Sequence, residues 1–311
     1  MSKFSCRKAF TSKLEEMAVC SDSLFLICTD SRGSVTAGSF AKKFPHRFIE
    51  VGIAEQNAVG IAAGLASTGK NVFVAGPACF LSARSYEQIK IDVAYNQQNV
   101  KIVGVSAGIS YGPLGGTHTT LHDFAGIRAI ADIELFVPSD AQQTAFITEY
   151  LCKSERPAYM RTGRGDVNAV YKVCESFDIH KAKHVMEGSD VTIIACGEMV
   201  HPSKMAAEML SKDGINARML DMFCLKPSDE EAIIKAANET RAILTVEEHS
   251  ISGGLGELVC SVTANYCPVP VKIMALPDCE IKVGSSAELF VHYGFTPENI
   301  ALQTKKLISA L

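Results

Sequence analysis

A single carboxylate in an otherwise small and apolar segment is the first candidate for chemistry. Residues 51–66 read VGIAEQNAVGIAAGLA, and Glu55 is the one ionisable side chain among them. Glu55 follows a predicted strand at 47–51 and opens a helix, where a carboxylate stabilises the helix N-terminus by about 0.3–1 kcal/mol. The small residues that follow predict a helix that is buried all round or very closely packed. In that setting Glu55 would lie out of water and would carry a proton or anchor a ligand nitrogen.

A glycine-rich loop carries the second candidate, His118. The segment PLGGTHTTLHD covers residues 113–123, and its glycines permit close approach of the backbone to a ligand. His118 and His122 stand four residues apart beside Asp123, but no third metal ligand at a suitable spacing is evident, so we predict no metal site. A loop histidine that hydrogen-bonds a polar substrate is the better functional interpretation, and a plain polar loop is the alternative.

Arginines follow two of the predicted strands. Arg161 and Arg164 lie in the segment RTGRG, and Arg32 occupies a similar place after another strand. Guanidinium groups bind phosphate in a bidentate manner, so converging loops of this kind would form an oxyanion site at the carboxyl ends of the strands. Arginines on a solvated linker between domains are the alternative.

Strands and helices that could position these residues alternate along the whole chain. In the first half, short and nearly continuous apolar runs predict strands at residues 24–28, 71–75, 100–105, 134–138 and 158–161. Helices are predicted between them at residues 54–67, 82–95, 123–130 and 141–153. The pattern weakens after residue 163 and restarts at residue 191. We therefore predict an α/β protein of two parallel-type domains, residues 1–170 and the smaller 190–311, with a linker at 171–189.

The composition excludes several classes of protein. The chain has 311 residues, is 47% hydrophobic and carries a net charge of −4, so it has no basic excess for a nucleic acid partner. Its apolar runs reach only strand length, and its start, MSKFSCRKAF, lacks the apolar core of a signal peptide, so no membrane partner is predicted. The 11 cysteines show no CxxC spacing, which is typical of reduced thiols in the cytoplasm.

Taken together, these segments resemble the C-terminal half of transketolase and of 1-deoxyxylulose-5-phosphate synthase, from about residue 5 to about residue 308. The most similar type is the separately encoded C-terminal subunit of split transketolases. The most specific segment is FAKKFPHRFIEVGIAEQN at residues 40–57, which resembles the signature of the family's pyrimidine-binding domain. Phe80 followed by RSYEQ at residues 84–88, the Gly-Gly-Thr-His loop and the closing Arg-Thr-Gly-Arg are also similar.

The resemblance implies an enzyme that uses thiamine diphosphate. Glu55 would hydrogen-bond the N1′ atom of the aminopyrimidine and exchange a proton with it. Phe80 would stack on that ring, and Asp30 would lie near the cofactor. The implied ligands of the substrate's oxygens and phosphate are His118, which is also a catalytic candidate, with Arg164, Arg84 and Arg32. The second domain, of the transketolase C-terminal type, would serve mainly in assembly.

The sequence departs from the family's pattern in two respects. It has no Gly-Asp-Gly followed by Asn, the family's diphosphate and Mg²⁺ site, so the resemblance implies a partner N-terminal subunit that holds Mg²⁺ and shares the cofactor. Two copies of each subunit, a heterotetramer, are the family-level expectation. Leu114 stands where transketolases place an Asp that reads a substrate hydroxyl, and Asn57 stands where many relatives have His. A branched, deoxy or sulfonated sugar phosphate is therefore a plausible substrate.

The leading hypothesis is a transketolase subunit that transfers a two-carbon ketol unit between sugar phosphates. The enzymatic alternatives are the beta subunit of a 2-oxo acid dehydrogenase, which has a similar architecture, and a deoxyxylulose phosphate synthase-like enzyme. A non-catalytic regulatory paralogue is the alternative from another class. The intact Glu55 and Phe80 disfavour that alternative, because an inactive site has no physical need for a buried acid.

Overall fold

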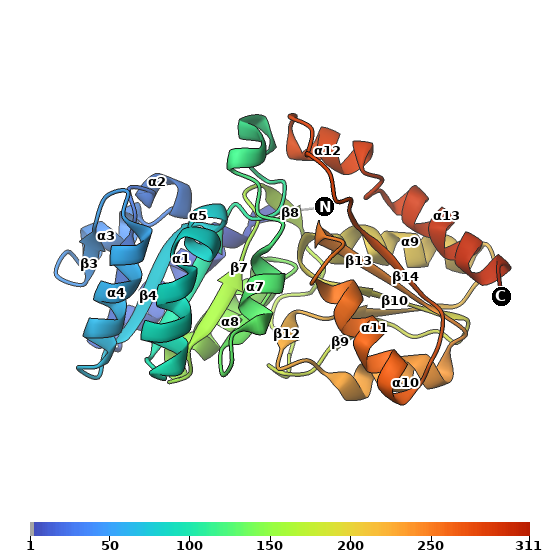
Figure 1. Ribbon diagram of the computed structural model, residues 1–311, viewed down its shortest axis with the longest axis horizontal. Coiled ribbons are helices and arrows are strands. Elements are labelled where there is room, and N and C mark those ends of the chain that lie inside the picture. Colours follow the sequence, from blue (N-terminus) through green and yellow to red (C-terminus); the bar gives the residue numbers. More distant parts are fainter. Residues whose placement is uncertain (1–2) are drawn as a thin grey trace.

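Parallel strands form the framework of the first half of the chain. The computed structural model describes residues 3–311. Its larger sheet contains β2 (Leu24–Cys28), β3 (Phe48–Glu50), β4 (Asn71–Pro77), β5 (Val100–Val105), β6 (Glu134–Phe136), β7 (Ala158–Arg161) and β12 (Cys224–Lys226). The strand order is β12-β6-β7-β5-β4-β2-β3, and the neighbours from β6 to β3 are parallel. Figure 1 labels β12, β7, β4 and β3 of this sheet. The predicted α/β fold is confirmed.

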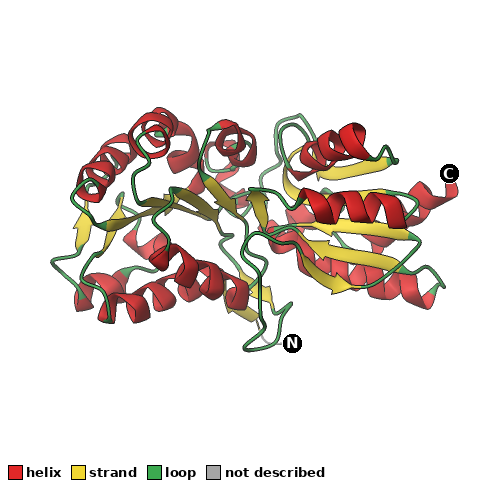
Figure 2. Cartoon of the chain, turned by 90° about the horizontal axis from the view of Figure 1, so that it is seen from below, coloured by secondary structure: helices red, strands yellow, loops and turns green. Residues whose placement is uncertain are grey.

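Helices cover both faces of this sheet (Figure 2). Apolar residues of alternating strand positions pack against α1 and α8 on one face and against α4 on the other, as their nearly continuous apolar character predicts. The predicted helix at 82–95 is broken into α5, α6 and the π-helical η1. The helical elements are α1 (Cys6–Val19), α2 (Arg32–Val35), α3 (Gly38–Lys43), α4 (Glu55–Ala66), α5 (Ala78–Arg84), α6 (Tyr86–Gln88), η1 (Ile89–Tyr95), η2 (Gly112–Thr117), α7 (Asp123–Ala129) and α8 (Ala141–Lys153).

The second half builds a smaller sheet. Its strands are β9 (Lys183–Met186), β10 (Val191–Ala195), β11 (Ala217–Asp221), β13 (Ile243–Ser250) and β14 (Val271–Leu276), in the order β14-β13-β10-β11-β9. All neighbours are parallel except β9, which pairs antiparallel with β11. Around them lie η3 (Gly197–Met199), α9 (Val200–Lys212), α10 (Glu230–Glu239), α11 (Leu255–Tyr266), α12 (Ser286–His292) and α13 (Pro297–Ser309). A separate pair, β1 (Lys3–Ser5) and β8 (Asp166–Asn168), is antiparallel.

The two halves are interlocked. β9 lies inside the predicted linker at 171–189, whose bounds stay a prediction, and β12 crosses from the second half to pair with β6 of the first sheet. The Lys226 ammonium at the end of β12 donates to the carbonyl of Arg128, 2.9 Å away in α7. The sequence did not predict β12, because a strand of three residues is too short to show a period.

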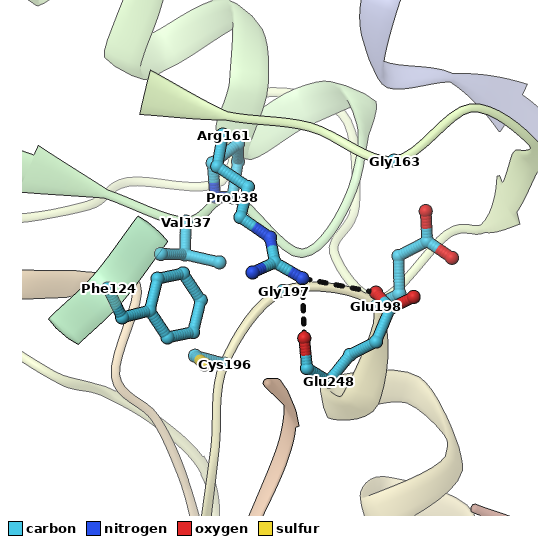
Figure 3. A pocket seen from close by; sticks show the side chains of 9 residues that line it. All are labelled: Phe124, Val137, Pro138, Arg161, Gly163, Cys196, Gly197, Glu198 and Glu248. Carbon is cyan, nitrogen blue, oxygen red and sulfur yellow. Dashed lines mark hydrogen bonds and ion pairs between the residues drawn. The ribbon is translucent and has the colours of Figure 1, made fainter. Parts of the chain in front are cut away.

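A buried polar cluster also joins the halves (Figure 3). Arg161 at the end of β7 is 4% exposed, and its guanidinium donates to the Asp123 carboxylate at 2.9 Å and to the Glu248 carbonyl at 2.6 Å. The Glu248 carboxylate lies 3.4 Å from the same guanidinium and accepts from the backbone N–H of Ile109 at 2.7 Å. Strand β13 of the second half therefore holds both the end of β7 and the loop after β5.

The prediction that Arg161 shares an oxyanion site with Arg164 is wrong. The charge of Arg161 is already matched inside the protein by Asp123 and Glu248, and the buried guanidinium also lies 4.4 Å above the ring of Phe124. Breaking such a buried pair to bind a ligand would leave carboxylates without a counter-charge, which is strongly unfavourable.

A second glycine-rich segment allows a helix to pack closely on a strand. Residues 253–256 enter helix α11, where the Glu247 carboxylate accepts from the backbone N–H groups of Leu255 and Gly256 at 2.6 and 2.7 Å. A Cβ on Gly256 would lie 2.5 Å from the side chain of Ile273, so the glycine permits close packing of helix on strand.

Two further features concern the whole described chain. Within residues 3–311, no helix combines the length and the apolar character that a membrane crossing requires. All 11 cysteines lie in the described part of the chain, and each is a free thiol.

The buried cluster predicts a pH-dependent stability. Burial raises the pKa of the carboxyl groups of Glu198 and Glu248 above the ordinary value of 4.5, and the nearby charge of Glu198 raises that of Glu248 further. An acid with a raised pKa in the folded state binds more protons folded than unfolded, so its contribution to the free energy of unfolding falls as the pH rises. We expect Glu248→Gln, which mimics the protonated acid, to gain stability relative to the natural chain between about pH 5 and about pH 8.

Urea unfolding of both proteins at several pH values measures this difference. Glu280→Gln is the matched control, because Glu280 is an exposed carboxylate outside the cluster. Parallel pH curves for the natural chain and Glu248→Gln would contradict the assignment.

Candidate active site

The predicted site residues lie in the loops and helices that follow the strands at one edge of the larger sheet. Each follows the carboxyl end of a parallel strand, and the five strands concerned are neighbours in the order β7-β5-β4-β2-β3. Carboxyl ends of parallel strands meet at a common edge, where ligands bind in open α/β sheets. In strand order, the residues are Arg164 after β7, His118 after β5, Phe80 and Arg84 after β4, Asp30 and Arg32 after β2, and Glu55 after β3.

Glu55 lies out of water, as predicted. Its side chain is 1% exposed at the start of α4, and it makes no hydrogen bond to the free backbone N–H groups of that helix. Its partner is Arg84, whose Nη1 lies 2.5 Å from Oε2 of Glu55. Within residues 3–311, the other oxygen of Glu55 accepts no hydrogen bond. The acid is therefore more than a helix cap, because its side chain faces across to α5.

Arg84 also lies over the ring of Phe80. The guanidinium carbon of Arg84 is 4.6 Å from the ring centroid, so a planar group with N–H donors lies against an aromatic ring and a carboxylate at once. A protonated aminopyrimidine is also planar and also donates N–H hydrogen bonds. Phe80 and Glu55 therefore fit that ring. Arg84 was predicted as a phosphate ligand, and its role stays a prediction.

Helix α4 is buried on one side and open on the other. Ala58, Ala62 and Ala66 pack into the core, whereas Asn57 is exposed and Gly64 has no atom within 4 Å of the position that a Cβ would take. Of the two predicted alternatives, burial all round is therefore wrong for this chain by itself, because residues 3–311 supply packing for one face only, and that face is packed closely against the core.

His118 lies beside Phe80 and thus beside the pair formed by Glu55 and Arg84. The imidazole meets the Phe80 ring edge-on at 5.2 Å between centroids, and Thr117 Oγ1 lies 2.9 Å from Nδ1. The loop that carries it turns at Gly115, whose φ of 69° favours glycine. Leu114 in the same loop is 53% exposed.

The remaining predicted residues lie at the rim of the site. The side chains of Asp30 and Arg32 are exposed, and the backbone N–H of Asp30 donates to the Glu50 carboxylate at 2.6 Å. Asp30 has a φ of 56°, a strained conformation for a residue other than glycine, so its loop is held in an uncommon shape. Arg164 lies 4.3 Å above the ring of Tyr111. Tyr111 was not predicted from the sequence, because nothing in its spacing distinguishes it from other loop tyrosines.

The geometry offers a site for an organic ligand rather than a metal centre. No group of three or more His, Cys, Asp and Glu side chains within residues 3–311 is arranged to hold a metal ion. The site instead combines a buried acid, an aromatic ring, a histidine and arginines at the rim. Burial raises the pKa of Cys79, next to Phe80, to about 11, so this thiol stays neutral near neutral pH.

Two family models match the chain. One is described as the pyrimidine binding domain of transketolase and matches residues 2–169, and the other is described as the C-terminal domain of transketolase and matches residues 180–300. The resemblance drawn from the sequence motifs is confirmed by both matches.

Individual relatives extend this finding. One of the subunits of an apulose-4-phosphate transketolase, from Phocaeicola vulgatus, is 51% identical over 296 residues, which are 95% of this chain and 95% of the relative. A 6-deoxy-6-sulfo-D-fructose transketolase subunit of a Clostridium species is 34% identical over 294 residues, or 94% of this chain and 91% of that relative. A solved structure described as a split gene transketolase in an inactive beta4 tetramer has a TM-score of 0.89 and 34% identity and covers 99% of both chains.

Transketolases as a family depend on thiamine diphosphate. The fold, the two matched domains and full-length relatives well above 30% identity lead to the same conclusion. This chain belongs to the transketolase family.

Proposed function

We propose that this chain is the pyrimidine-binding subunit of a two-component transketolase that transfers a two-carbon ketol unit between sugar phosphates. The observation that carries the proposal is the buried carboxylate of Glu55, bound to a planar cation that also lies on the ring of Phe80. Several relatives are subunits of this type, each matched over most of its length, which supports the proposal.

The residues of this chain prepare and shield the reacting atoms. When bound, thiamine diphosphate supplies the nucleophilic carbon and the electron sink that ketol transfer requires. Glu55 holds a proton at N1′ of the aminopyrimidine, and Phe80 fixes the plane of that ring. Arg84 holds only Oε2 of Glu55, so the ring would meet the other oxygen or displace Arg84 from Oε2. His118 donates a hydrogen bond to a substrate oxygen and can carry a proton there.

The phosphate of the sugar binds at the rim, where Arg164 lies in the loop after β7 and Arg32 begins α2, after β2. Arg32 has an exposed side chain that is free to meet a ligand, and Arg164 is held over Tyr111. Guanidinium groups bind phosphate oxygens in pairs of parallel hydrogen bonds, so two arginines suffice to orient the sugar with its carbonyl towards His118 and Glu55. Asp30, in the strained loop that precedes Arg32, would lie near the cofactor.

A partner subunit completes the site. The sequence lacks the family's diphosphate and Mg²⁺ motif, so the other end of the cofactor must be held by another chain, with two copies of each subunit in the assembly. The open face of α4 supports this proposal, because Gly60 and Gly64 leave room for a close approach at the helix that Glu55 begins. Two relatives are themselves described as subunits of transketolases, and a similar chain forms a tetramer. The free thiols of the described chain support a cytoplasmic location.

The substrate belongs to the branched, deoxy or sulfonated sugar phosphates. Leu114 cannot accept a hydrogen bond from a substrate hydroxyl, and it shares its surroundings with Val283, whose Cγ2 lies 3.1 Å from the Cβ position of Gly115. Leu114 is 53% exposed and Val283 70% exposed, so an apolar surface lies where transketolases place an acid. Two relatives carry names with apulose 4-phosphate, a branched sugar phosphate, and 6-deoxy-6-sulfo-D-fructose, a deoxy sugar with a sulfonate in place of the phosphate.

The central prediction concerns Glu55. The purified chain is expected to be inactive alone and to transfer ketol units when co-expressed with a partner that carries Gly-Asp-Gly followed by Asn, in the presence of thiamine diphosphate and Mg²⁺. Glu55→Ala is expected to reduce turnover of the complex by a factor of at least about 100, because a positioned proton donor contributes about 10²–10⁴ to the rate. A panel of ketose phosphates measures the activity, and thermal unfolding confirms that the variant is folded.

Glu230→Gln is the matched control, because Glu230 is also a carboxylate in the first turn of a helix but is exposed on α10. Full turnover by the isolated chain would refute the two-component proposal. Decarboxylation of pyruvate with a lipoyl acceptor would assign the 2-oxo acid dehydrogenase instead.

A second prediction tests the partner surface on α4. Gly64→Leu is expected to weaken assembly with the partner chain by at least about tenfold, because the added side chain fills the space that a close approach requires. The same change is expected to leave the isolated chain at least as stable, since glycine inside a helix is about 1 kcal/mol less favourable than alanine or leucine. Sedimentation of mixtures measures assembly. Ser211→Leu on the exposed side of α9 is the control, and equal assembly of both variants would contradict the proposal.

A third prediction tests the choice of sugar. Leu114→Asp is expected to raise kcat/KM for fructose 6-phosphate, an ordinary ketose phosphate, by about tenfold or more, because a hydrogen-bond acceptor in a substrate site discriminates strongly for a hydroxyl. The same variant is expected to lower kcat/KM for apulose 4-phosphate. Leu114→Asn separates the hydrogen bond from the charge. An unchanged preference in both variants would place the selection of sugars elsewhere.

A further inference from the structure

Tyr111 lies at the meeting point of three loops of the candidate site. Its hydroxyl lies 2.9 Å from Oγ of Ser34, and its ring lies beneath the guanidinium of Arg164 at 4.3 Å from the ring centroid. The ring also meets the imidazole of His118 edge-on, with 5.5 Å between centroids and an interplanar angle of 82°. Ser34, Arg164 and His118 follow three different strands. The side chain of Tyr111, from the same loop as His118, therefore joins the segments that follow all three strands.

The contact with Ser34 reaches the second rim arginine. Ser34 lies in α2, the short helix that begins with Arg32. Holding Ser34 therefore fixes the helix that presents Arg32, while the ring holds the guanidinium of Arg164 directly. Tyr111 acts on the two arginines in two different ways, through its hydroxyl on one and through its ring on the other.

Arg7 of α1 ties the same two loops together through their backbones. Its Nη1 donates to the carbonyl of Ser34 and its Nη2 to the carbonyl of Arg164, both at 2.5 Å. Arg7 thus fixes how far apart the two loops lie, whereas Tyr111 contacts the side chains. Burial and the nearby charge of Arg164 lower the pKa of Arg7, which reflects how closely the cations of this region are gathered. A dianionic group such as a phosphate monoester would relieve that repulsion.

We propose that Tyr111 is the positioning residue for the phosphate of the substrate. This role of Tyr111 rests on the proposed function. It adds to that function a residue that orders Arg164 and Arg32 before the sugar binds. A long arginine side chain loses rotamer freedom when it binds a ligand, and a guanidinium already held on an aromatic ring loses less. The edge contact with His118 further fixes the distance between the phosphate site and the histidine that faces the reacting end of the sugar.

Two variants remove the hydroxyl contact from opposite sides. Tyr111→Phe keeps the ring and loses the hydrogen bond, and Ser34→Ala loses the same bond from the other partner. In the assembled complex, each is expected to raise KM for the preferred ketose phosphate by about 3- to 10-fold, the effect of one hydrogen bond, with kcat within about twofold. The double variant is expected to match the single variants, because all three remove one shared contact.

A third variant removes the ring. Tyr111→Leu frees the guanidinium of Arg164 and takes away the edge contact with His118. It is expected to raise KM by more than Tyr111→Phe does and also to lower kcat, because the histidine loses its fixed orientation. The order of the variants in KM, and the appearance of a kcat effect only when the ring is lost, separate the two contacts.

The same ketose without its phosphate distinguishes positioning from a general structural role. For that substrate, Tyr111→Phe and Ser34→Ala are expected to leave KM within about twofold of the natural complex. Tyr266→Phe is the matched control, since Tyr266 is 64% exposed on α11 and touches none of these loops. Equal increases in KM for the phosphorylated and unphosphorylated sugars, or natural values for Tyr111→Phe and Ser34→Ala, would overturn the proposal.

A binding measurement keeps this test separate from the proposed activity. Calorimetric titration of the complex with inorganic phosphate is expected to give an affinity about 3- to 10-fold weaker for Tyr111→Phe than for the natural complex. If the natural complex transfers no ketol units, the proposed function fails, and the phosphate affinities still decide the role of Tyr111. Equal phosphate affinities in all variants would overturn the role of Tyr111 even in an active enzyme.

Discussion

A carboxylate that leaves water must regain its hydrogen bonds or a counter-charge, and this requirement at Glu55 organises the site. The small residues of α4 let the helix pack closely on the sheet, which buries the acid at its first turn. Among the described residues, Arg84 alone meets the charge of Glu55, and it does so across the face of Phe80. The acid, the cation and the ring are therefore one unit, and a ligand that displaces the cation must offer both a planar face and an N–H group.

The second half of the chain reaches the site through the ends of its strands. The carboxylate of Glu248 holds the N–H of Ile109, two residues before Tyr111, and a Cβ on Gly108 would lie 2.2 Å from that carboxyl group. The start of the histidine loop thus rests on β13 of the other half. The sequence predicted that the second domain serves mainly in assembly. Its contact with Ile109 adds a local role, because it anchors the start of the loop that carries His118, which is closed by a bridge between Gly108 and Thr120.

Local features of the site followed from the sequence, whereas its long-range pairings did not. The composition of one helix was enough to predict that Glu55 leaves water, and strand–helix alternation was enough to predict a parallel sheet. Arg161 was misassigned because its partner Glu248 lies 87 residues further along the chain, and no spacing links them. Tyr111 was missed for a related reason. Its contacts join segments after three different strands, and only the strand order brings those segments together. Strand order depends on which edges pair, and periodicity carries no information about that.

The ion pair between Glu55 and Arg84 matters for the stability of the chain between its synthesis and its assembly with the proposed partner. Under the proposed function, this chain folds before its partner subunit binds, and an unmatched buried acid would weaken it during that interval. Arg84 supplies the missing charge from within the same polypeptide. Its side chain is 44% exposed and sits on a flexible stem, so it can withdraw without disturbing the core. In the proposed enzyme, Arg84 would thus neutralise the carboxylate of Glu55 until the partner subunit and the cofactor bind.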